Sequence, residues 1–256
     1  MSDIQALLFD IGNTRLKWGY WSGARISKTG DLTHEQIHEK GFAALTSRLP
    51  RKVTHALACN VAGTAIATKL SGVIGLHCDL DLRFARCDRK AYGLTTSYKQ
   101  PRHLGIDRWV AMIGAWNEFR SALCIVDAGT AMTIDVVDRA GQHLGGQIIP
   151  GIRLMGESLR SETSGISAGR KKSRDPGDGL GIFGKSTDDA VAFGALTAAC
   201  GVIERSAKRI RGAGMRPKIV LTGGDASRIL KQLNSNAIHR PHLVLQGLAT
   251  MLQSEK

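Results

Sequence analysis

The pattern of apolar and polar positions predicts two places where a buried strand runs into a glycine turn. The apolar run Leu7–Phe9 leads into Asp10-Ile11-Gly12-Asn13-Thr14, and the run Cys124–Val126 leads into Asp127-Ala128-Gly129-Thr130. Short apolar runs bounded by turn residues are typical of strands that are buried on both faces. Aligning Asp10 with Asp127 also aligns Gly12 with Gly129. This repetition predicts two halves of similar structure.

Both turns carry residue types that suit a phosphate group. Gly12 lets the backbone turn tightly and expose its amide groups, while Asn13 and Thr14 can donate hydrogen bonds to phosphate oxygens. Asp10, at the end of the strand, can hold Mg²⁺ through water molecules. We therefore expect the two halves to face one nucleotide.

The rest of the chain alternates between strand-like and helix-like periodicity. Strands are predicted at 7–10, 16–20, 24–27, 54–61, 75–82, 123–128, 131–138, 143–149 and 218–221. Helices are predicted at 33–41, 42–48, 106–119, 153–160, 188–211, 226–233 and 243–252, and one more opens at 62–64. Segments 92–106 and 161–184 are predicted to be loops, and the second of them to be mobile, because it is rich in glycine and lacks a period.

Composition restricts the class of protein. An apolar content of 43% with 22% charged residues is typical of a globular chain that buries a core. No stretch approaches the roughly 18 consecutive apolar residues of a membrane helix, and the first residues lack the basic start of a secretory signal. The five cysteines form no CxxC pair, so we expect buried free thiols in a reducing compartment. These features predict a cytoplasmic protein that does not interact with a membrane.

The net charge of +13 predicts attraction to anionic molecules, most simply to small ones such as nucleotides. A basic face that binds nucleic acid is the alternative. However, lysine and arginine are spread along the chain, aromatic residues make up only 5%, and no known nucleic-acid-binding motif occurs. We therefore do not expect a nucleic-acid partner, and we interpret the basic run Arg170–Arg174 as a solvated loop.

One segment matches a zinc-binding motif. His34-Glu35-Gln36-Ile37-His38 has the H-E-x-x-H spacing, which places two imidazoles on one face of a helix. The third ligand position of the longer protease pattern holds Ala44, and no acidic residue lies between Glu39 and Asp79. The helix is also short and ends at Gly41. We interpret the segment as a solvated helix face.

Three motifs in order resemble the ATP-binding elements of the superfamily of acetate kinases, sugar kinases, heat-shock chaperones and actin. They are Asp10-x-Gly12-Asn13-Thr14, Asp127-x-Gly129-Thr130-Ala131 and Thr222-Gly223-Gly224. The resemblance implies an α/β fold of two ribonuclease-H-like halves, here 1–119 and 120–256, each with a mixed five-stranded sheet and flanking helices. Neither GxxxxGK[ST] nor GxGxxG occurs, so Walker-type and Rossmann-type sites lack support.

Further motifs narrow the resemblance to one family. Tyr92-Gly93, Leu104-Gly105-Ile106-Asp107-Arg108-Trp109, Gly145-Gly146-Gln147-Ile148-Ile149-Pro150-Gly151 and the segment 185–190 occur in this order. With the phosphate motifs, this set closely resembles the type III pantothenate kinases. The resemblance implies transfer of a phosphoryl group from ATP to the primary hydroxyl of pantothenate, which gives 4'-phosphopantothenate in the first step of coenzyme A biosynthesis. It also implies a homodimer with active sites near the interface.

The same resemblance implies roles for individual residues. Asp107 would be the general base, in an orientation fixed by hydrogen bonding at a helix start. Asp127 would ligate a monovalent cation, potassium or ammonium, and Asp10 would hold Mg²⁺ through water. The residues assigned to ATP and its phosphates are Asp10, Ile11, Gly12, Asn13, Thr14, Arg15, Leu16, Lys17, Gly129, Thr130, Gly223 and Gly224. The residues assigned to the acceptor are Tyr92, Gly105, Ile106, Asp107, Arg108 and Thr187.

Each assignment has a structural alternative. Asp107 and Arg108 could form an ion pair at a helix start, Tyr92 could pack in a core, and Thr187 could be a helix N-cap. The segment 163–168 also departs from the T-A-x-L-P of the family, which affects the element expected to contact the acceptor or the partner subunit.

Two alternative functions remain at this point. The first is another kinase or phosphatase of the same superfamily, such as a sugar kinase, although those chains are generally longer and the short G-x-D-R motif argues against them. The second is a catalytically weak family member that binds nucleotide and acts as a transcription accessory or regulatory protein. The presence of Asp10, Asp107 and Asp127 argues against an inactive protein.

Overall fold

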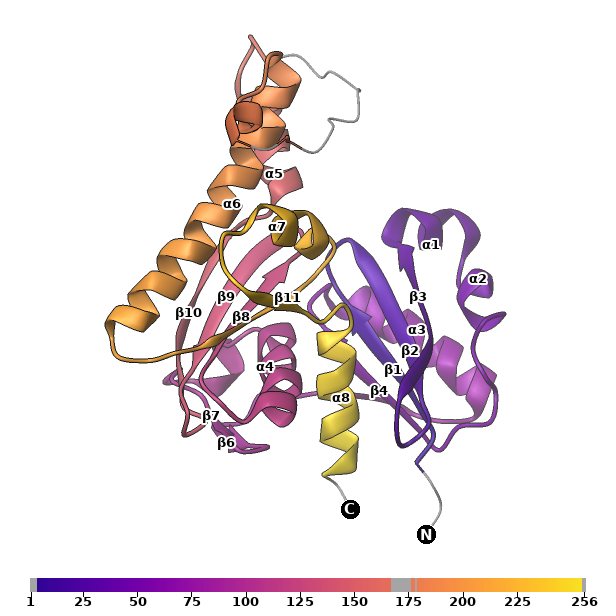
Figure 1. Ribbon diagram of the computed structural model, residues 1–256. Coiled ribbons are helices and arrows are strands. Elements are labelled where there is room, and N and C mark those ends of the chain that lie inside the picture. Colours follow the sequence, from indigo (N-terminus) through magenta and orange to yellow (C-terminus); the bar gives the residue numbers. More distant parts are fainter. Residues whose placement is uncertain (1–3, 167–175, 178, 255–256) are drawn as a thin grey trace. The chain divides into compact units, whose positions relative to one another are not determined.

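The computed structural model describes residues 4–166, 176–177 and 179–254 (Figure 1). By contacts the chain divides into unit 1, which comprises Met1–Arg120, Gly141–His143 and His242–Lys256, and unit 2, which comprises Ser121–Ala140 and Leu144–Pro241. The basic run 170–174 and part of the predicted loop 161–184 lie outside the described residues. The boundary between residues 119 and 120, as a boundary between separate domains, stays a prediction.

Unit 1 contains a mixed five-stranded sheet with the first predicted strand at its centre. In spatial order its strands are β3 (Ile26–Thr33), β2 (Arg15–Trp21), β1 (Ala6–Ile11), β4 (His55–Asn60) and β5 (Leu82–Phe84). β1 is antiparallel to β2 and parallel to β4. Every residue of β1 is buried, as expected for a central strand that is covered on both faces.

Helices and short elements complete unit 1. They are α1 (His34–Lys40), α2 (Ala43–Thr46), α3 (Thr64–Cys78), α4 (Ile106–Phe119), α8 (Leu243–Gln253), the 3-10 helix η1 (Pro101–His103) and the strands β6 (Lys90–Ala91) and β7 (Leu94–Thr95). The predicted start of α1 is confirmed, because Thr33 and Gln36 form a reciprocal capping box. α4 has the predicted bounds 106–119. α8 ends the chain but belongs to unit 1, where it packs against α4.

The prediction of a strand at 75–82 is wrong. Apolar residues alternate at Leu76, Cys78 and Leu80, but Leu76 is 93% exposed and so contributes to no core. The segment instead continues α3, which has Leu70 and Ile74 buried one helical turn apart. Asp79 ends this helix in the left-handed region, at φ 54° and ψ 45°. Its N–H donates to the carbonyl of Gly75, and the strand that follows is limited to β5.

Unit 2 repeats the sheet of unit 1. Its strands in spatial order are β10 (His143–Pro150), β9 (Ala131–Val137), β8 (Leu123–Ala128), β11 (Lys218–Thr222) and β12 (Ala237–His239). Its helices are α5 (Ile152–Glu162), α6 (Thr187–Gly212), α7 (Ala226–Gln232) and the 3-10 helix η2 (Gly179–Ile182). β8 is antiparallel to β9 and parallel to β11, as β1 is to β2 and β4. The prediction of two similar halves, each with a mixed five-stranded sheet and helices, is therefore confirmed.

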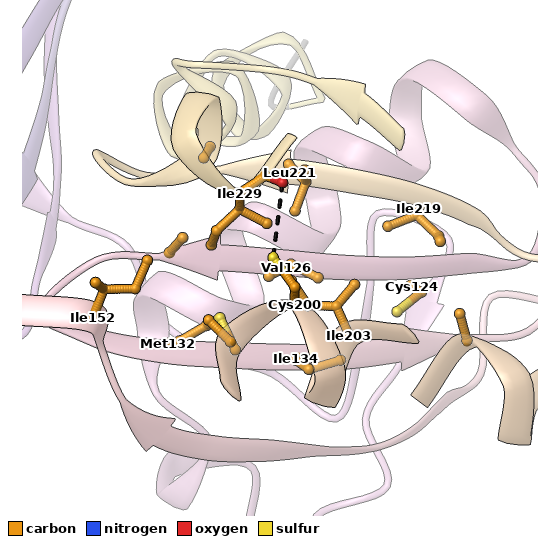
Figure 2. Close-up of a cluster of buried hydrophobic side chains, with 14 of the residues drawn as sticks. Cys124, Val126, Met132, Ile134, Ile152, Cys200, Ile203, Ile219, Leu221 and Ile229 are labelled. Carbon is orange, nitrogen blue, oxygen red and sulfur yellow. Dashed lines mark hydrogen bonds between the residues drawn. The ribbon is translucent and has the colours of Figure 1, made fainter. Parts of the chain in front are cut away.

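The core of unit 2 lies between this sheet and its helices. Figure 2 shows Cys124 and Val126 of β8 and Met132 and Ile134 of β9 together with residues of the other elements, all buried. The remaining labelled residues are Ile152 of α5, Cys200 and Ile203 of α6, Ile219 and Leu221 of β11 and Ile229 of α7. Burial of such side chains stabilises each by about 1.5–3 kcal/mol, which makes this cluster the main attachment of α6 to the sheet.

α6 is long and apolar enough to cross a membrane by length and composition alone. Its apolar residues, however, are placed in the core, from Val191 and Leu196 to Ala207 and Ile210. α6 is therefore a core helix.

We expect substitution of Gly247 by alanine to destabilise unit 1. A Cβ atom at this position of α8 would overlap the carbonyl oxygen of Val110 in α4, so the two helices would have to separate. Overpacking of this kind costs about 1–3 kcal/mol of unfolding free energy. Gly72→Ala in α3 is the matched control, because a Cβ atom there has open space, and it should stabilise by about 0.5–1 kcal/mol. Chemical denaturation measures both; equal stability of the two variants would contradict this helix contact.

The five cysteines are free, and Cys59, Cys87, Cys124 and Cys200 are buried, so the prediction of buried free thiols is confirmed. Burial raises the pKa of the Cys124 thiol to about 12, aided by the nearby charge of Asp135 and opposed by Arg211. Burial also raises the pKa of Cys87 and Cys200 to about 11. Because only the thiolate reacts, these thiols are inert at neutral pH.

Burial raises the pKa of the Cys78 thiol as well, and Arg51 opposes this increase. Because Cys78 is only partly buried and a reagent can reach it, we expect it to be the first thiol to react with a disulfide reagent in the native protein at pH 8. Cys78→Ser should leave the native protein almost unreactive, while the unfolded variant should show the remaining thiols. Rapid labelling of the folded variant would show that the buried cysteines are accessible.

Candidate active site

The first glycine turn joins β1 to β2 in unit 1. The N–H of Gly12 donates to the carbonyl of Arg15 at 3.0 Å, which closes the turn that carries Asn13 and Thr14. Asn13 is exposed and Thr14 is partly buried, so both can be reached by a ligand. Ile11 is buried at the end of β1, just before this turn. The turn therefore presents polar groups on a rigid strand pair.

Charged residues flank this turn. Asp10 is 9% exposed and lies opposite Lys17 in the pairing of β1 with β2. Lys17 Nζ is 3.7 Å from Asp10 Oδ2. Arg15 forms an ion pair with Asp31 of β3, and Leu16 between the two cations is fully buried. Lys17 therefore lies beside the carboxylate that is predicted to bind Mg²⁺, whereas Arg15 pairs with Asp31.

The second part of the candidate site is the N-terminus of α4. Gly105 is the N-cap, and Ile106 and Asp107 begin the helix. Asp107 Oδ1 accepts the main-chain N–H of Arg108 at 2.8 Å, so the predicted hydrogen bond that orients this carboxylate is present. A Cβ atom at Gly105 would lie 2.7 Å from Asp107 Oδ1. Only glycine leaves room for the carboxylate in this orientation.

Arg108 is 6% exposed and is held by Tyr98, a residue that belongs to none of the predicted site motifs. Its Nη1 donates to the hydroxyl of Tyr98 at 3.1 Å, and its guanidinium carbon lies 5.8 Å from the centre of the Tyr98 ring. A cation at this distance is attracted by the ring. Tyr98 lies in the same loop as Gly105. Its position in the sequence does not show that Tyr98, and not Tyr92, contacts Arg108.

A cavity of about 530 Å³ adjoins the N-terminus of α4. It is lined in part by Gly105 and Ile106, and by Asn60 at the end of β4. Arg86, Arg102 and His103 also line it, and its described lining contains no acidic residue. The cavity therefore suits a small anionic molecule.

Tyr92 lies elsewhere. It lines a second cavity of about 420 Å³, together with Arg83, Phe84 and Arg86, and it has a positive φ of 56°. Arg86 lines both cavities, whereas Gly105 lines only the first. The structure thus brings Gly105, Ile106, Asp107 and Arg108 together and places Tyr92 in the neighbouring cavity. Arg86 was not predicted, because a single exposed arginine carries no sequence signal.

In unit 2, the second glycine turn follows Asp127 at the end of β8. The N–H of Gly129 donates to the carbonyl of Ala131 at 3.1 Å, as Gly12 does to Arg15. Thr130 is partly buried, and its carbonyl accepts the N–H of Gly151, the last residue of the G-G-x-I-x-P-G corner, at 2.9 Å. This corner therefore supports the predicted phosphate turn.

The Gly-Gly turn packs directly on Asp127. A Cβ atom at Gly223, which has a positive φ of 92°, would lie 2.5 Å from both Asp127 Oδ1 and the carbonyl oxygen of Ala128. Gly224 has open space around it. Asp225, next in the chain, is half-buried; burial raises the pKa of its carboxyl, and the guanidinium groups of Arg228 and Arg153 oppose that increase. The structure thus brings Asp127, Gly129, Thr130 and Gly223 together within unit 2.

Thr187 is the first residue of α6 and is exposed. The alternative that it is the N-cap is wrong, because the cap is Ser186, whose hydroxyl accepts the N–H of Asp189 at 3.2 Å. The side chain of Thr187 is therefore not needed to cap the helix.

The described residues contain no group of three or more His, Cys, Asp or Glu side chains that could hold a metal ion. α1, with the H-E-x-x-H spacing, has no buried residue, although the Nε2 atom of His34 is itself shielded from solvent. Cations in the candidate site would instead be held by oxygen atoms. The Asp127 carboxylate beside the Ala128 carbonyl is such a set, and hard cations such as K⁺ and Mg²⁺ prefer oxygen ligands.

Comparison with known proteins agrees with this geometry. A family model described as type III pantothenate kinase matches residues 6–209. The chain belongs to the type III pantothenate kinase family. The type III pantothenate kinase of Nitrosococcus oceani is 34% identical over 252 residues, which cover 95% of this chain and 92% of that protein. That of Teredinibacter turnerae is 34% identical over 254 residues, which cover 98% and 99%.

Solved structures agree on the fold. A Campylobacter jejuni structure described as a conserved Baf family transcriptional activator has a TM-score of 0.60 at 22% identity, covering 97% of this chain and 98% of that one. The ethanolamine utilization protein EutJ of Carboxydothermus hydrogenoformans has a TM-score of 0.53 at 11% identity, covering 98% and 90%. At such identities the likeness concerns the fold alone, and it confirms the predicted actin-like ATPase architecture.

The family match spans both units and contains the carboxylates Asp10, Asp107 and Asp127. It ends before Gly223 and Gly224, whose assignment to the adenosine stays a prediction.

We expect Gly223→Ala to destabilise the protein by about 1–3 kcal/mol, because the new methyl group would collide with the Asp127 carboxylate in a positive-φ turn. Gly224→Ala, one residue away and in open space, should change the unfolding free energy by about 0.5 kcal/mol or less. Urea denaturation of the two variants makes the comparison. Similar losses in both would contradict the packing of this turn on Asp127.

Proposed function

We propose that this chain transfers the γ-phosphoryl group of ATP to the primary hydroxyl of pantothenate and so makes 4'-phosphopantothenate, in the first step of coenzyme A biosynthesis. The observation that carries the proposal is the full-length family relationship, with the G-x-D-R motif intact at the start of α4. The cationic cavity beside this motif supports an acceptor that, like pantothenate, carries a carboxylate.

Asp107 is the general base in this proposal. Its carboxylate accepts the proton of the acceptor hydroxyl as the oxygen forms a bond to the γ-phosphorus and the bond from that phosphorus to the bridging oxygen of ADP breaks. The hydrogen bond from the Arg108 N–H to Oδ1 holds this carboxylate in one orientation. Arg108 and the backbone at Gly105 and Ile106 hold the acceptor, with Tyr92 and Thr187 as further contacts.

The two glycine turns hold ATP. Residues 10–17, Gly129 and Thr130 bind its phosphates, and Gly223 and Gly224 lie by the adenosine. Mg²⁺, held by Asp10 through water, and a monovalent cation, K⁺ or NH₄⁺, held by Asp127, would neutralise phosphate charge when bound. Lys17, beside Asp10, adds a fixed positive charge to the same end of the strand pair. Phosphoryl transfer requires mainly such alignment and charge neutralisation.

A homodimer is part of the proposal. Unit 2 exposes several large apolar side chains among its described residues, and such surfaces often mark contacts between proteins. These are Leu144, Ile148, Leu154, Leu159, Leu180 and Phe183. A Cβ atom at Gly194 or Gly201 of α6 would meet no atom within 4 Å, so this face of the helix is open to a second copy. Thr187, at the start of α6, would reach the acceptor of the partner subunit, and the enzyme would act in the cytoplasm.

We expect purified protein to release ADP from ATP in the presence of Mg²⁺ and pantothenate, and to need K⁺ or NH₄⁺ in place of Na⁺. Asp107→Asn should lower kcat by about 10²–10⁴-fold, because it removes the proton acceptor and keeps the shape. Asp79→Asn is the matched control, since Asp79 is an exposed helix cap for which asparagine is a good substitute.

Turnover that depends on K⁺ and collapses only in Asp107→Asn supports the reaction and the base. Activity that survives in Asp107→Asn contradicts the role of this carboxylate. A wild-type protein that binds ATP but shows no turnover with any cation contradicts the kinase. The alternative, a regulatory nucleotide-binding protein, then becomes the better explanation.

A further inference from the structure

His143 is a buried histidine that has no role in the proposed mechanism. Its side chain is not exposed to solvent at all. It is the first residue of β10, but Gly141–His143 belongs to unit 1, whereas the chain on either side belongs to unit 2. Burial of a polar ring is costly unless its contacts compensate, so the contacts of His143 are informative.

The segment Gly141–His143 is attached to the loop that precedes α4. Thr95 donates its N–H to the carbonyl of Gly141 at 2.9 Å, and Gln142 Nε2 donates to the carbonyl of Thr95 at 3.2 Å. A Cβ atom at Gly141 would overlap the carbonyl oxygen of Gly93, so this approach requires glycine. His143 is thereby brought to the residues that follow Thr95.

These residues connect His143 to the acceptor motif. The imidazole of His143 stacks on the ring of Tyr98, with ring centres 6.0 Å apart and an interplanar angle of 14°, and its Nδ1 lies 3.4 Å from Ser97 Oγ. The hydroxyl of Tyr98 accepts the hydrogen bond from Arg108 Nη1 at 3.1 Å. A buried ring therefore supports the phenol that holds the Arg108 guanidinium.

We propose that His143 is a positioning residue that sets the place of Arg108 through Tyr98, and thereby the affinity for the acceptor. The proposal rests on the proposed function for the identity of the acceptor. Arginine binds a carboxylate through a rigid planar fork, so its recognition depends on orientation as well as charge. Loss of the His143 ring would remove the stacking contact of Tyr98, the residue whose hydroxyl accepts from Arg108.

The test compares steady-state kinetics of His143→Ala, His143→Phe and Tyr98→Phe. His143→Ala should raise KM for pantothenate about tenfold, less than the roughly hundredfold loss that a 1 Å misplacement can cause. KM for ATP and kcat should change less than about threefold. His143→Phe keeps a ring for stacking and should restore KM for pantothenate to within about threefold of the wild type.

Tyr98→Phe removes the hydroxyl that holds Arg108 and should raise the same KM. The double variant should be no worse than the poorer single variant, because both changes act on one guanidinium. The control is His77→Ala, which removes a partly buried histidine of unit 1 whose Nε2 lies 3.2 Å from the Leu49 carbonyl. It should lower stability without changing either KM.

A second measurement does not depend on turnover. In protein labelled with ¹⁵N-arginine, the guanidinium signal of Arg108, assigned with Arg108→Lys, should move in His143→Ala and not in His77→Ala. An unmoved signal, or a moved signal with an unchanged KM for pantothenate, overturns the role of His143. If the wild type shows no turnover, the proposed function fails, and the guanidinium signal alone decides whether His143 positions Arg108.

Discussion

A guanidinium that is buried loses its hydrogen bonds to water, so other groups must replace them. This requirement determines which residues surround Arg108 in unit 1. The side chain is 6% exposed, and Tyr98 offers it both a hydroxyl acceptor and a ring face. Tyr98 is supported in turn by His143, which reaches it from a segment that follows β9 in the chain. The main-chain N–H of Arg108 also orients Asp107. The proposed base and the proposed acceptor-binding cation therefore share one rigid helix start, as efficient proton transfer to a fixed group requires.

The two sheets determine where the carboxylates Asp10 and Asp127 lie. In each, a buried central strand ends in a carboxylate and a glycine turn, and the next strand returns antiparallel. Side chains alternate between the faces of a strand, so the equal register of Asp10 and Asp127 follows from the equal spacing of their apolar runs. The environments still differ. Lys17 lies beside Asp10, whereas Asp127 has the Gly223 turn and the Ala128 carbonyl beside it. The two carboxylates, although related by the repeat, therefore have different neighbours.

The fold could be predicted wherever the local signal was strong. α4 follows its apolar period from Ile106 to Phe119, and the capping box at Thr33 marks the start of α1. The prediction of a strand at 75–82 is wrong because a short alternating run can fit the period of a strand as well as that of a helix. The burial of Leu70 and Ile74 shows that the segment continues α3. Thr187 was considered as a cap, yet Ser186 one residue earlier takes that place. The exact residue at which a helix begins or ends depends on individual hydrogen bonds, which the pattern of apolar and polar residues does not show.

By itself the sequence determined the strand–turn repeats, the order of the motifs and hence the family, because these depend on residues close together in the chain. Only the tertiary structure decided that Tyr98 contacts Arg108, that Tyr92 lies in a neighbouring cavity with Arg86, and that α8 returns to pack on α4. It also decided that His143 lies within unit 1 although the rest of β10 belongs to unit 2. The contacts of His143 and α8 join segments that are far apart in the chain, whereas Tyr98 and Arg108 are ten residues apart. Their partners are selected by packing and by compensation of buried polar groups, and neither leaves a periodic signal in the sequence.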